Sequence, residues 1–493
     1  MNNYTGINLT NSLDKNIGLI NGILGNDETI VYRELQTNKA NGIKCCIIFA
    51  DGMTDKHIVN DNIIKPILEC DVEDLKQNEI IDYFISNVIS NGDIKKSKDI
   101  NTIISGVLYG KTIIFAENCD DAIILDTIGW EKRSIEEPKS ETIVRGPREG
   151  FTESLNVNIS LLRRKILSSD LKLVFMEIGT RTKTKICVCY LEGVAEESIL
   201  KELLQRIKKI NIDGIMDTGY IEELIKDAPF SPIRTISSTE RPDVASGKIL
   251  EGKFALICDG TPTVLTLPKL FVENFQSDED YFNNYIFSSI TRILRWMGFW
   301  LTTSVPAIYV AVITFHQEFL PTPLLLSIAV ARQGVPFPTI VETMVMLIIF
   351  ETLKEAGLRM PKHIGQAMSI VGALVLGEAA VTAKLVSAPI VIVTALTGVS
   401  SFMIPQVSEI IPIRIIFLIM SSFLGIYGYV FGVMGLALHL YSLRSFGVPY
   451  MLNIPPGSFQ EFKDTIIRAP WWEMYFRTKS IAKDKRRMKN PKS

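Results

Sequence analysis

The chain has 493 residues, too many for one compact hydrophobic core, and its mean hydropathy of +0.21 is higher than soluble globular chains usually reach. These two values exclude a single soluble domain. The formal net charge is only −2, but the last 17 residues hold eight basic side chains and one acidic side chain. The carboxyl-terminal tail is therefore a distinct basic segment.

The amino terminus, MNNYTGINLTNSLDKN, is polar and contains no apolar segment of signal-peptide length. All seven cysteines precede residue 260, and their odd number argues against a disulfide framework and for a reducing compartment. Cys187 and Cys189 share one face of an expected strand, and we interpret them as core residues. The amino-terminal part is therefore expected to be cytoplasmic.

The first predicted elements are α/β in character. The apolar run Ile43–Ala50 predicts a buried strand, and the amphipathic segment His57–Leu68 predicts a helix after it. Thr112–Ala116 and Ala122–Asp126 flank an acidic turn and predict a β-hairpin. A first subdomain is expected over residues 1–141, because a charged, proline-containing stretch ends there.

A second α/β subdomain is expected over residues 142–288. Leu171–Ile178 and Lys183–Glu192 predict two further strands, and Glu196–Ile210 predicts a helix. The two subdomains show a weak internal similarity. LYGK (108–111) precedes the first hairpin, and the similar LEGK (250–253) also precedes an apolar run and an acidic turn. The sequence therefore predicts two subdomains with related hairpins.

No set of residues typical of an enzyme or a cofactor site is present in the sequence. Gly110-Lys111-Thr112 resembles the end of a phosphate-binding loop, but the glycine spacing is one residue short and a strand follows instead of a helix. There is no HExxH motif, no GxSxG elbow and no cysteine–histidine cluster of zinc spacing, and histidine occurs only four times. We therefore expect no enzyme, no cofactor and no metal.

The segment VRGPREGFT, residues 144–152, shows no regular periodicity, and Pro147 prevents a simple helix. Arg145, Arg148 and Glu149 are candidates for a coupling or subunit-contact loop, because opposite charges can pair across a protein interface. The alternative is a solvated loop with local ion pairs, which is the commoner situation for such residues. Both interpretations stay open.

The segment from Trp296 to Tyr441 contains 12 charged residues, none of them aspartate, which is the depletion that hydrocarbon requires. We therefore expect an all-α polytopic membrane bundle over residues 289–445. Four stretches reach the length of a membrane span, namely 296–315, 364–386, 388–405 and 415–441. Residues 319–357 are ambiguous between spanning, re-entrant and interfacial positions.

Basic residues at the ends of the apolar stretches indicate the orientation of the bundle. Arg292 and Arg295 precede the first span and Arg414 precedes the last, so the positive-inside rule places the amino-terminal region in the cytoplasm. The basic tail, residues 446–493, lies close behind the last span and is expected on the same side. Both termini inside require an even number of crossings.

Charged groups at membrane depth are costly, so each is a candidate for function. The pore or gate candidates are Glu351, Glu355, Glu378 and Lys384. Glu378 and Lys384 are six residues apart, about 240° around a helix, so they cannot pair within one helix. Glu351 and Glu355 share a face on which Lys354 can offset one of them, and Glu342 lies on the opposite face from Glu351. The alternative is an interfacial helix whose charges are solvated.

Seven stretches of the sequence resemble one known family. They are VRGPREGFTESL (144–155), LLRRKI (161–166), SGKILEGKFALICDGTPTVLTLP (246–268), QEFLPTPLL (317–325), GVPFP (334–338), ETLKEAGLRMP (351–361) and GQAMSIVGALVLGEAAV (365–381). In order and spacing they are similar to the A subunit of the GerA-type spore germinant receptors. The similarity runs from about residue 30 to about residue 478.

The resemblance implies a subunit of a nutrient-sensing receptor complex in the inner membrane of bacterial spores, which triggers germination. It implies as partners a multispanning B subunit that holds the nutrient pocket, a lipoprotein C subunit, membrane lipid and no nucleic acid. It also implies a homo-oligomer, a ring of A subunits that opens as a cation channel.

Three classes of function compete for this sequence. A sensor and channel subunit would shift between closed and open bundle states when a nutrient binds elsewhere in the complex. A secondary transporter component would need internal repeats of spans and broken helices at mid-membrane, and 296–441 shows no such repeat. A membrane-tethered enzyme is the third, and the missing catalytic residues disfavour it. A non-conducting scaffold that couples signals is the alternative to a conducting subunit. The channel subunit is the function that we expect.

Overall fold

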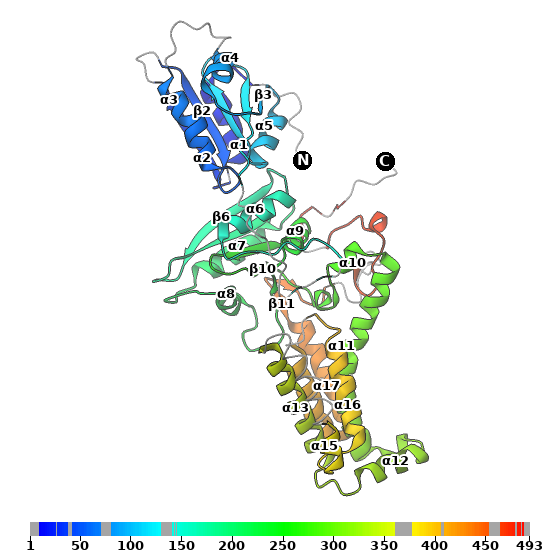
Figure 1. Cartoon of the computed structure of the whole chain (residues 1–493). Coiled ribbons are helices and arrows are strands. Elements are labelled where there is room, and N and C mark those ends of the chain that lie inside the picture. The colour runs from blue at the N-terminus through cyan, green and yellow to red at the C-terminus, as the bar shows by residue number, and fades with distance from the viewer. Residues whose placement is uncertain are drawn as a thin grey trace.

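The computed structural model describes residues 9–25, 27–37, 42–70, 80–129, 141, 143, 145–359, 377–405, 409–452, 464–478, 481–484 and 486–487. The chain forms two α/β units followed by a bundle of helices (Figure 1). The first unit lies at one end of the molecule, the second lies in the middle, and the bundle extends from the second unit to the other end. The fold class is thus α/β in the amino-terminal region and all-α in the bundle, as the sequence predicts.

A five-stranded antiparallel sheet in the order β1-β2-β4-β5-β3 forms the first unit. Its strands are β1 (Ile30–Gln36), β2 (Lys44–Ala50), β3 (Ile94–Ser97), β4 (Thr112–Ala116) and β5 (Ala122–Leu125). One face is covered by α1 (Leu13–Leu24) and α5 (Ile100–Leu108), and the other by α2 (Lys56–Val59), α3 (Lys65–Glu69), α4 (Ile80–Tyr83) and the π-helical turns Asn60–Ile64 and Phe84–Val88. Because both faces are covered, the central strands are apolar throughout, which confirms the predicted strand and hairpin.

The second unit has the same architecture. Its sheet has the order β6-β7-β9-β10-β8, with strands β6 (Leu171–Ile178), β7 (Thr184–Leu191), β8 (Ser237–Thr239), β9 (Phe254–Cys258) and β10 (Val264–Leu267). Its helices are α6 (Leu155–Lys165), α7 (Glu197–Lys208), α8 (Thr218–Ile225) and α9 (Pro242–Leu250). The two predicted strands and the predicted helix of this region are confirmed.

The two units are copies of one fold with a constant spacing along the chain. Strands β4 and β5 and helix α5 each begin 142 residues before β9, β10 and α9. The helix starts also correspond, because Asn16 bonds through its side chain to both backbone groups of Thr10, and Asn158 does the same with Thr152. The related hairpins that LYGK and LEGK predict are therefore part of a full duplication.

A buried ion pair joins the two units. Arg163 on α6 is 2% exposed and pairs through Nη2 with the carboxylate of Asp27, and the same nitrogen donates to Thr29 Oγ1 at 2.5 Å. Asp27 also forms a parallel β-bridge with Leu173 of the second sheet. Arginine and aspartate are rarely buried without a partner, so this contact fixes the first unit to the second.

The bundle is built around two long helices. Its helices are α10 (Glu279–Phe282), α11 (Tyr285–Phe315), α12 (Thr322–Arg332), α13 (Thr339–Arg359), α15 (Gly377–Thr382), α16 (Ala388–Ser401) and α17 (Ile410–Ser442), with 3₁₀ turns at Phe271–Phe275 and Gln317–Phe319. Among the described residues, α11 and α17, the latter taken over its full range, are the two helices that are long and apolar enough to cross a membrane. Helix α11 rises about 46 Å over its 31 residues, more than the roughly 30 Å of a bilayer core.

The predicted spans correspond to the bundle helices in part. Residues 296–315 lie within α11 and residues 415–441 lie within α17. Helix α16 has 14 residues and ends before 405, so this segment is a shorter helix than the predicted span 388–405. Of the predicted span 364–386, residues 364–376 lie outside the described residues, and the remainder forms α15 and a turn.

The region that was ambiguous in the sequence, 319–357, forms α12 and most of α13. Helix α13 packs against α11 and α16, so it is a member of the bundle. No residue of α12 is buried, and Figure 1 shows this helix extending sideways from the far end of the bundle. The two helices therefore differ in environment although their sequences are similarly apolar.

Helix α17 is broken at Gly425, where φ is 60° and ψ is −140°. The rings of Phe417 and Tyr429, which a straight helix would hold about 18 Å apart, lie 5.7 Å from each other. The helix is therefore a hairpin of two antiparallel segments, 410–424 and 426–442. The uncharged stretch that the sequence presents as one span contains a turn, because only glycine adopts this backbone conformation without strain.

The two ends of the α17 hairpin lie together at the second α/β unit. Glu409 before the first segment and Ser445 after the second both contact Lys269, which follows β10. A Cβ atom placed on Gly425 at the tip would lie 3.0 Å from Cβ of Phe315, the last residue of α11. The hairpin thus runs from the sheet side of the bundle to the far end and back.

Gly425→Ala is expected to destabilise the hairpin and to lower the melting temperature of the purified chain in detergent by several degrees. The left-handed conformation costs a residue with a side chain about 1–3 kcal/mol, and the new Cβ would lie 2.8 Å from Nε2 of His316. Gly435→Ala is the matched control, because it lies in the same helix and no atom lies within 4 Å of its Cβ position. Equal melting temperatures for the two variants would contradict the hairpin.

The described part of the tail returns to the second α/β unit. It contains the short strands β11 (Arg444–Ser445) and β12 (Val448–Pro449) and the 3₁₀ turn Trp471–Glu473. Ala482 forms a β-bridge with Ala195, and Nζ of Lys483 lies 2.9 Å from Oε1 of Glu197. Ala482 and Lys483 of the tail are therefore docked on this unit.

Candidate coupling site

The junction between the second α/β unit and the bundle brings together segments that are far apart in the sequence. The end of β10, the 3₁₀ turn Phe271–Phe275, the amino-terminal half of α11, both ends of α17 and strand β11 meet there. A movement of the sheet would reach the bundle through these contacts. We therefore regard the junction as the candidate coupling site.

Lys269 is the central charged residue of this site, and it is fully buried. Its Nζ lies 3.0 Å from Oε1 of Glu409 at the start of α17, and its backbone N–H donates to Ser445 Oγ at 3.1 Å. The Ser445 hydroxyl in turn donates to the carbonyl of Thr235 at 2.6 Å. Burial lowers the pKa of Lys269, and the Glu409 carboxylate acts in the opposite direction. One residue thus ties the sheet to both ends of the hairpin.

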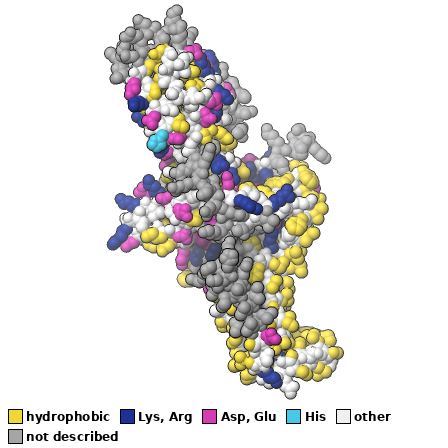
Figure 2. Space-filling view, viewed as in Figure 1, with side chains coloured by type: hydrophobic (Ala, Val, Ile, Leu, Met, Phe, Trp, Pro, Cys, Tyr) yellow, Lys and Arg dark blue, Asp and Glu magenta, His cyan; other side chains and the backbone are white. Residues whose placement is uncertain are grey.

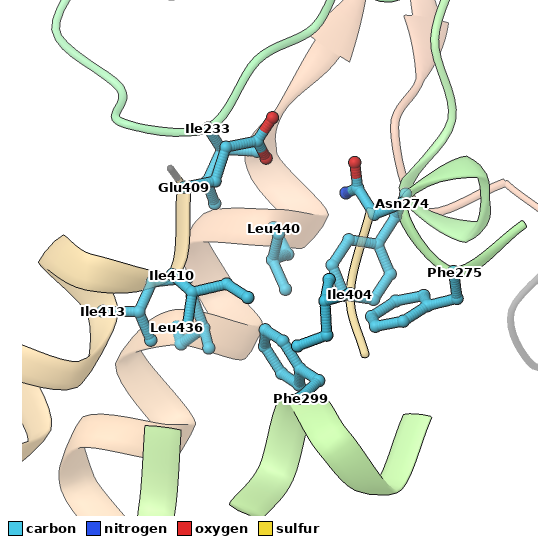
Figure 3. Close-up of a pocket in the computed structure, with 11 residues that line it drawn as sticks. Ile233, Asn274, Phe275, Phe299, Ile404, Glu409, Ile410, Ile413, Leu436 and Leu440 are labelled. Carbon is cyan, nitrogen blue, oxygen red and sulfur yellow. The ribbon is translucent and has the colours of Figure 1, made fainter. Parts of the chain in front are cut away.

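A small cavity of about 20 Å³ lies beside this ion pair (Figure 3). Its lining is apolar except for Glu409 and Asn274, and it has room for about one water molecule. The rings of Phe275 and Phe299 meet edge to face at 5.5 Å, and Nδ2 of Asn274 donates to the Tyr450 hydroxyl at 3.1 Å. Closely packed side chains transmit displacement, so the junction is suited to mechanical coupling.

A second cluster of buried charges connects the amino-terminal part of α11 to the tail. Arg292 is fully buried, with Nε at 3.2 Å from Oδ2 of Asp280 and Nη1 at 2.9 Å from Oδ1 of Asp464. Arg295 also pairs with Asp280, at 2.8 Å. The sequence presents these arginines only as flanking charges of a span. In the structure each has a carboxylate partner, and Arg292 links the bundle to the tail.

The predicted gate residue Glu351 forms an ion pair inside the bundle. Its Oε1 accepts from Nη2 of Arg414 on α17 at 2.7 Å, and Lys354 lies 3.6 Å from its other oxygen. The Arg414 side chain is 2% exposed, so this carboxylate compensates a buried positive charge. Glu355 lies one turn further along α13 and is exposed. Glu351 therefore connects two bundle helices, and the predicted role of Lys354 as its neutralising neighbour agrees with the distance.

Glu378 and Lys384 lie near the other end of the bundle from Glu351. Both side chains are exposed, and within the described part of the chain they do not pair with each other. Lys384 has a positive φ of 54°, and its side chain packs beside Gly334, between α12 and α13. The structure therefore does not bring the four pore or gate candidates together in one place.

The candidates Arg145, Arg148 and Glu149 lie in the segment between the two α/β units. Glu149 pairs with two basic residues at the end of α6, at 3.2 Å from Nη2 of Arg164 and 3.0 Å from Nζ of Lys165. Arg145 and Arg148 are exposed. Glu149 thus makes the local ion pairs of the simpler interpretation, and a role of the loop in subunit contact stays a prediction.

Sequence reasoning missed several of the charges that the fold buries most completely. Lys269 and Glu409 are 140 residues apart and carry no motif, so only the fold reveals the pair. Glu342 was noted only for its distance from Glu351, although an acid within the apolar run at the start of α13 is itself a signal. Within the described ranges, no group of three or more histidine, cysteine, aspartate or glutamate residues is placed to hold a metal ion.

Comparison with known proteins gives relatives along almost the whole chain. The chain is 43% identical over 476 residues to spore germination protein KA of Bacillus subtilis (strain 168), which covers 96% of this chain and 87% of the relative. It is 36% identical over 467 residues to spore germination protein GerLA of Bacillus cereus, with 94% and 92% covered. It is also 42% identical over 448 residues to the uncharacterized membrane protein YfkQ of Bacillus subtilis (strain 168), with 90% and 86% covered.

Among solved structures, the crystal structure of the N-terminal domain of the A subunit of the Bacillus megaterium spore germinant receptor GerK3 matches 54% of this chain and 98% of that chain. The sequence identity is 29% and the TM-score is 0.43. Residues 19–480 match the family model described as Bacillus/Clostridium GerA spore germination protein. This chain therefore belongs to the GerA family of spore germination proteins.

Proposed function

We propose that this chain is the A subunit of a nutrient-sensing germinant receptor in the spore inner membrane and that several copies form a nutrient-gated cation channel. Its relatives are named as spore germination proteins, which supports the receptor role. Ionisable groups buried between apolar helices carry the channel proposal. Arg414 and Glu351 form such a pair between α17 and α13, and Glu342 is fully buried in the same bundle.

The junction supplies a route for gating. Nutrient binding elsewhere in the complex would shift the second α/β unit, and the buried pair of Lys269 and Glu409 would pass the shift to the α17 hairpin. The Glu351–Arg414 pair lies on the first segment of that hairpin, so a displacement there would strain or break it. The α17 hairpin thus connects the sheet to the charged residues of the bundle.

The outer surface of the bundle supports assembly in a membrane. Large apolar side chains are exposed on α11 and α17, including Phe287, Phe423 and Tyr427, and Figure 2 shows hydrophobic side chains over much of the visible bundle. Lipid and neighbouring copies of the chain would cover this surface. A B subunit and a lipoprotein C subunit complete the proposed receptor.

The proposed orientation places both termini in the cytoplasm. The sheets before α11 and the tail after α17 lie at the same end of the bundle, which supports a multi-pass arrangement with an even number of crossings. The basic residues that flank the apolar helices favour the cytoplasmic side for that end.

A non-conducting scaffold is the second candidate function. The buried pairs at Lys269 and Arg292 hold the sheet, the bundle and the tail together, which a purely mechanical relay would also require. A scaffold would pass a nutrient signal to another protein and would not itself carry ions.

Spores that carry Glu351→Gln are expected to lose most of their response to nutrient, measured as potassium release and fall in optical density. The change leaves the Arg414 guanidinium buried without its carboxylate, at a cost of about 3 kcal/mol. Exchanging the two residues, as Glu351→Arg with Arg414→Glu, should restore part of the response.

Glu378→Gln is the matched comparison, because its side chain is exposed near the far end of the bundle. An unchanged response in Glu378→Gln spores would remove that residue from the gate candidates. A normal response in Glu351→Gln spores, with normal protein levels, would contradict the gating role of the Glu351–Arg414 pair.

A further inference from the structure

Near the end of the bundle remote from the sheets, four polar side chains from different elements meet. They are Glu342 on α13, Arg332 at the end of α12, Ser387 just before α16 and Tyr309 on α11, which packs against the cluster that contains Val386 and Ile390. Glu342 is fully buried and Ser387 is 1% exposed. No motif predicts this cluster, and none of the pore candidates from the sequence belongs to it.

The hydrogen bonds of the cluster are incomplete. Oε1 of Glu342 accepts from the backbone N–H of Ser387, but Oε2 has no hydrogen-bond partner within the described part of the chain. Nε of Arg332 lies 3.8 Å from Oε2, too far for a hydrogen bond. The Ser387 and Tyr309 hydroxyls face each other, and apart from that contact neither hydroxyl, nor Nε of Arg332, has a hydrogen-bond partner within the described part of the chain.

Buried polar groups of folded proteins are nearly always hydrogen-bonded, so three oxygen atoms with incomplete hydrogen bonding in one cluster point to a ligand. Three of the groups present oxygen, and one of these is a carboxylate, which is the ligand chemistry of a hard cation. A single carboxylate suits a monovalent cation better than a divalent one, because divalent sites generally combine several carboxylates. An anion would meet the buried charge of Glu342 and be repelled.

Arg332 already supplies one positive charge to this site. Its guanidinium lies beside the carboxylate, and its side chain is 24% exposed. It is carried by α12, in which no residue is buried, so Arg332 can leave Glu342 without disrupting a packed core. A guanidinium that approaches a carboxylate without hydrogen-bonding to it is a weakly held occupant.

We propose that Glu342, Ser387 and Tyr309 form a binding site for a monovalent cation, and that the Arg332 guanidinium occupies the place of that cation in this conformation. The inference deepens the proposed channel function, because it names the residues that the conducted ion would meet. The existence of the cation site does not itself require conduction. Displacement of Arg332 would open the site.

Equilibrium binding of radiolabelled rubidium to the full-length chain in detergent tests the proposal. Arg332→Gln removes the competing charge and should raise the affinity for rubidium at least roughly ten-fold. Adding Glu342→Gln to that variant should abolish the gain. Arg332→Lys keeps the charge and should bind rubidium no better than the natural chain.

Glu318→Gln is the matched control, because Glu318 is an acid with a 69% exposed side chain at the same end of the bundle. It should leave rubidium binding unchanged in the Arg332→Gln background. Binding is counted per folded protein after size-exclusion chromatography, so that loss of folding is not mistaken for loss of a site. Equal affinity of Arg332→Gln and the natural chain would overturn the proposal, as would a gain that survives Glu342→Gln.

Ion flux separates this inference from the channel proposal. If Arg332→Gln binds rubidium but no form of the receptor conducts, the cation site stands and the channel proposal fails. If the receptor conducts and rubidium binding does not depend on Arg332 and Glu342, the channel stands and the site is wrong. If the cation site and the channel are both correct, Arg332→Gln should also increase cation flux in the absence of nutrient.

Discussion

Lys269→Met is expected to lower the free energy of unfolding by about 3–5 kcal/mol, because it leaves the Glu409 carboxylate buried at the junction without its cation. Lys269 is fully buried and the Glu409 side chain is 8% exposed, so water cannot replace the lost partner. Thermal unfolding of the purified chain in detergent measures the loss. Spores with this variant should not respond to nutrient, because the side-chain tie between the sheet and the start of the α17 hairpin is lost.

A double variant separates stability from coupling. Lys269→Met with Glu409→Met replaces the whole pair by apolar side chains, which is often neutral or stabilising for a buried ion pair. The double variant should therefore regain most of the melting temperature. If the pair transmits the signal, the nutrient response should stay impaired in a protein that is folded and abundant.

Lys208→Met is the control, since Lys208 is an exposed lysine on α7 of the same unit. It should change neither melting temperature nor nutrient response. A Lys269→Met protein that melts like this control would show that the junction does not depend on the ion pair. A normal response of the double variant would show that the pair stabilises the junction without carrying the signal.

Glu273→Gln is expected to destabilise the second α/β unit by about 3–5 kcal/mol at neutral pH. The Glu273 carboxylate pairs with both Lys248 and Lys253, and it accepts from the backbone N–H of Leu270 at 2.7 Å. The Glu273 and Lys253 side chains are each 7% exposed. The buried ammonium group of Lys253 and the half-buried one of Lys248 would lose their shared carboxylate in this variant.

The same residue predicts a pH dependence. Burial alone would raise the pKa of Glu273, but Lys248 and Lys253 outweigh it and lower the pKa to about 2. An unfolded glutamate titrates near 4.3, so the folded state is favoured by about 3 kcal/mol above that pH. This contribution is lost as the pH falls from about 4 towards 2, because the folded carboxylate then takes up its proton.

Melting temperatures between pH 2 and pH 7 test this dependence. Glu273→Gln should remove a large part of the decrease at acid pH, because its side chain cannot titrate. Glu223→Gln, an exposed position on α8, should retain the pH profile of the natural chain. If Glu273→Gln keeps the full acid transition, other carboxylates cause it and the pairing is less important than the distances indicate.

Local sequence patterns predicted most of the secondary structure of the sheets. Ile43–Ala50 and Leu171–Ile178 are apolar because helices and loops cover the sheets, and such runs are recognisable without a fold. The order of the strands was not predictable, because β3 and β8 lie at sheet edges next to strands that follow them in the chain. From the sequence we recognised the duplication only in the similarity of LYGK to LEGK. A second similarity, which we did not use, lies between LTNSLDKNIGLI (9–20) and FTESLNVNISLL (151–162), because both segments begin a helix in the same way.

The bundle was predicted less completely than the sheets. Apolar length identified α11 and α17, but the turn at Gly425 carries no signal that distinguishes this glycine from Gly428, Gly432 or Gly435 nearby. The contacts of the surrounding helices determine at which of these glycines the helix breaks. The membership of α13 in the bundle was also open, since its charges fit both a solvated and a buried helix.

The sequence drew attention to single charges of the bundle but did not identify their partners, and it did not point to Lys269 and Glu409 of the coupling site. Glu351 was recognised because a charge in an apolar region is costly, whereas its partner Arg414 was interpreted only as a marker of orientation. The partner of Arg292 was not identified either, since Asp464 lies 172 residues away. Periodicity locates a charge on a helix, but the partner across the fold depends on packing.

Ion flux into liposomes that contain the purified chain, alone and with its B and C partners, tests the central claim most directly. The account predicts cation flux that depends on nutrient and on the partners, and that Glu351→Gln abolishes. Absence of flux under every combination, with folded protein and an intact nutrient response in spores, would contradict the channel and favour the scaffold.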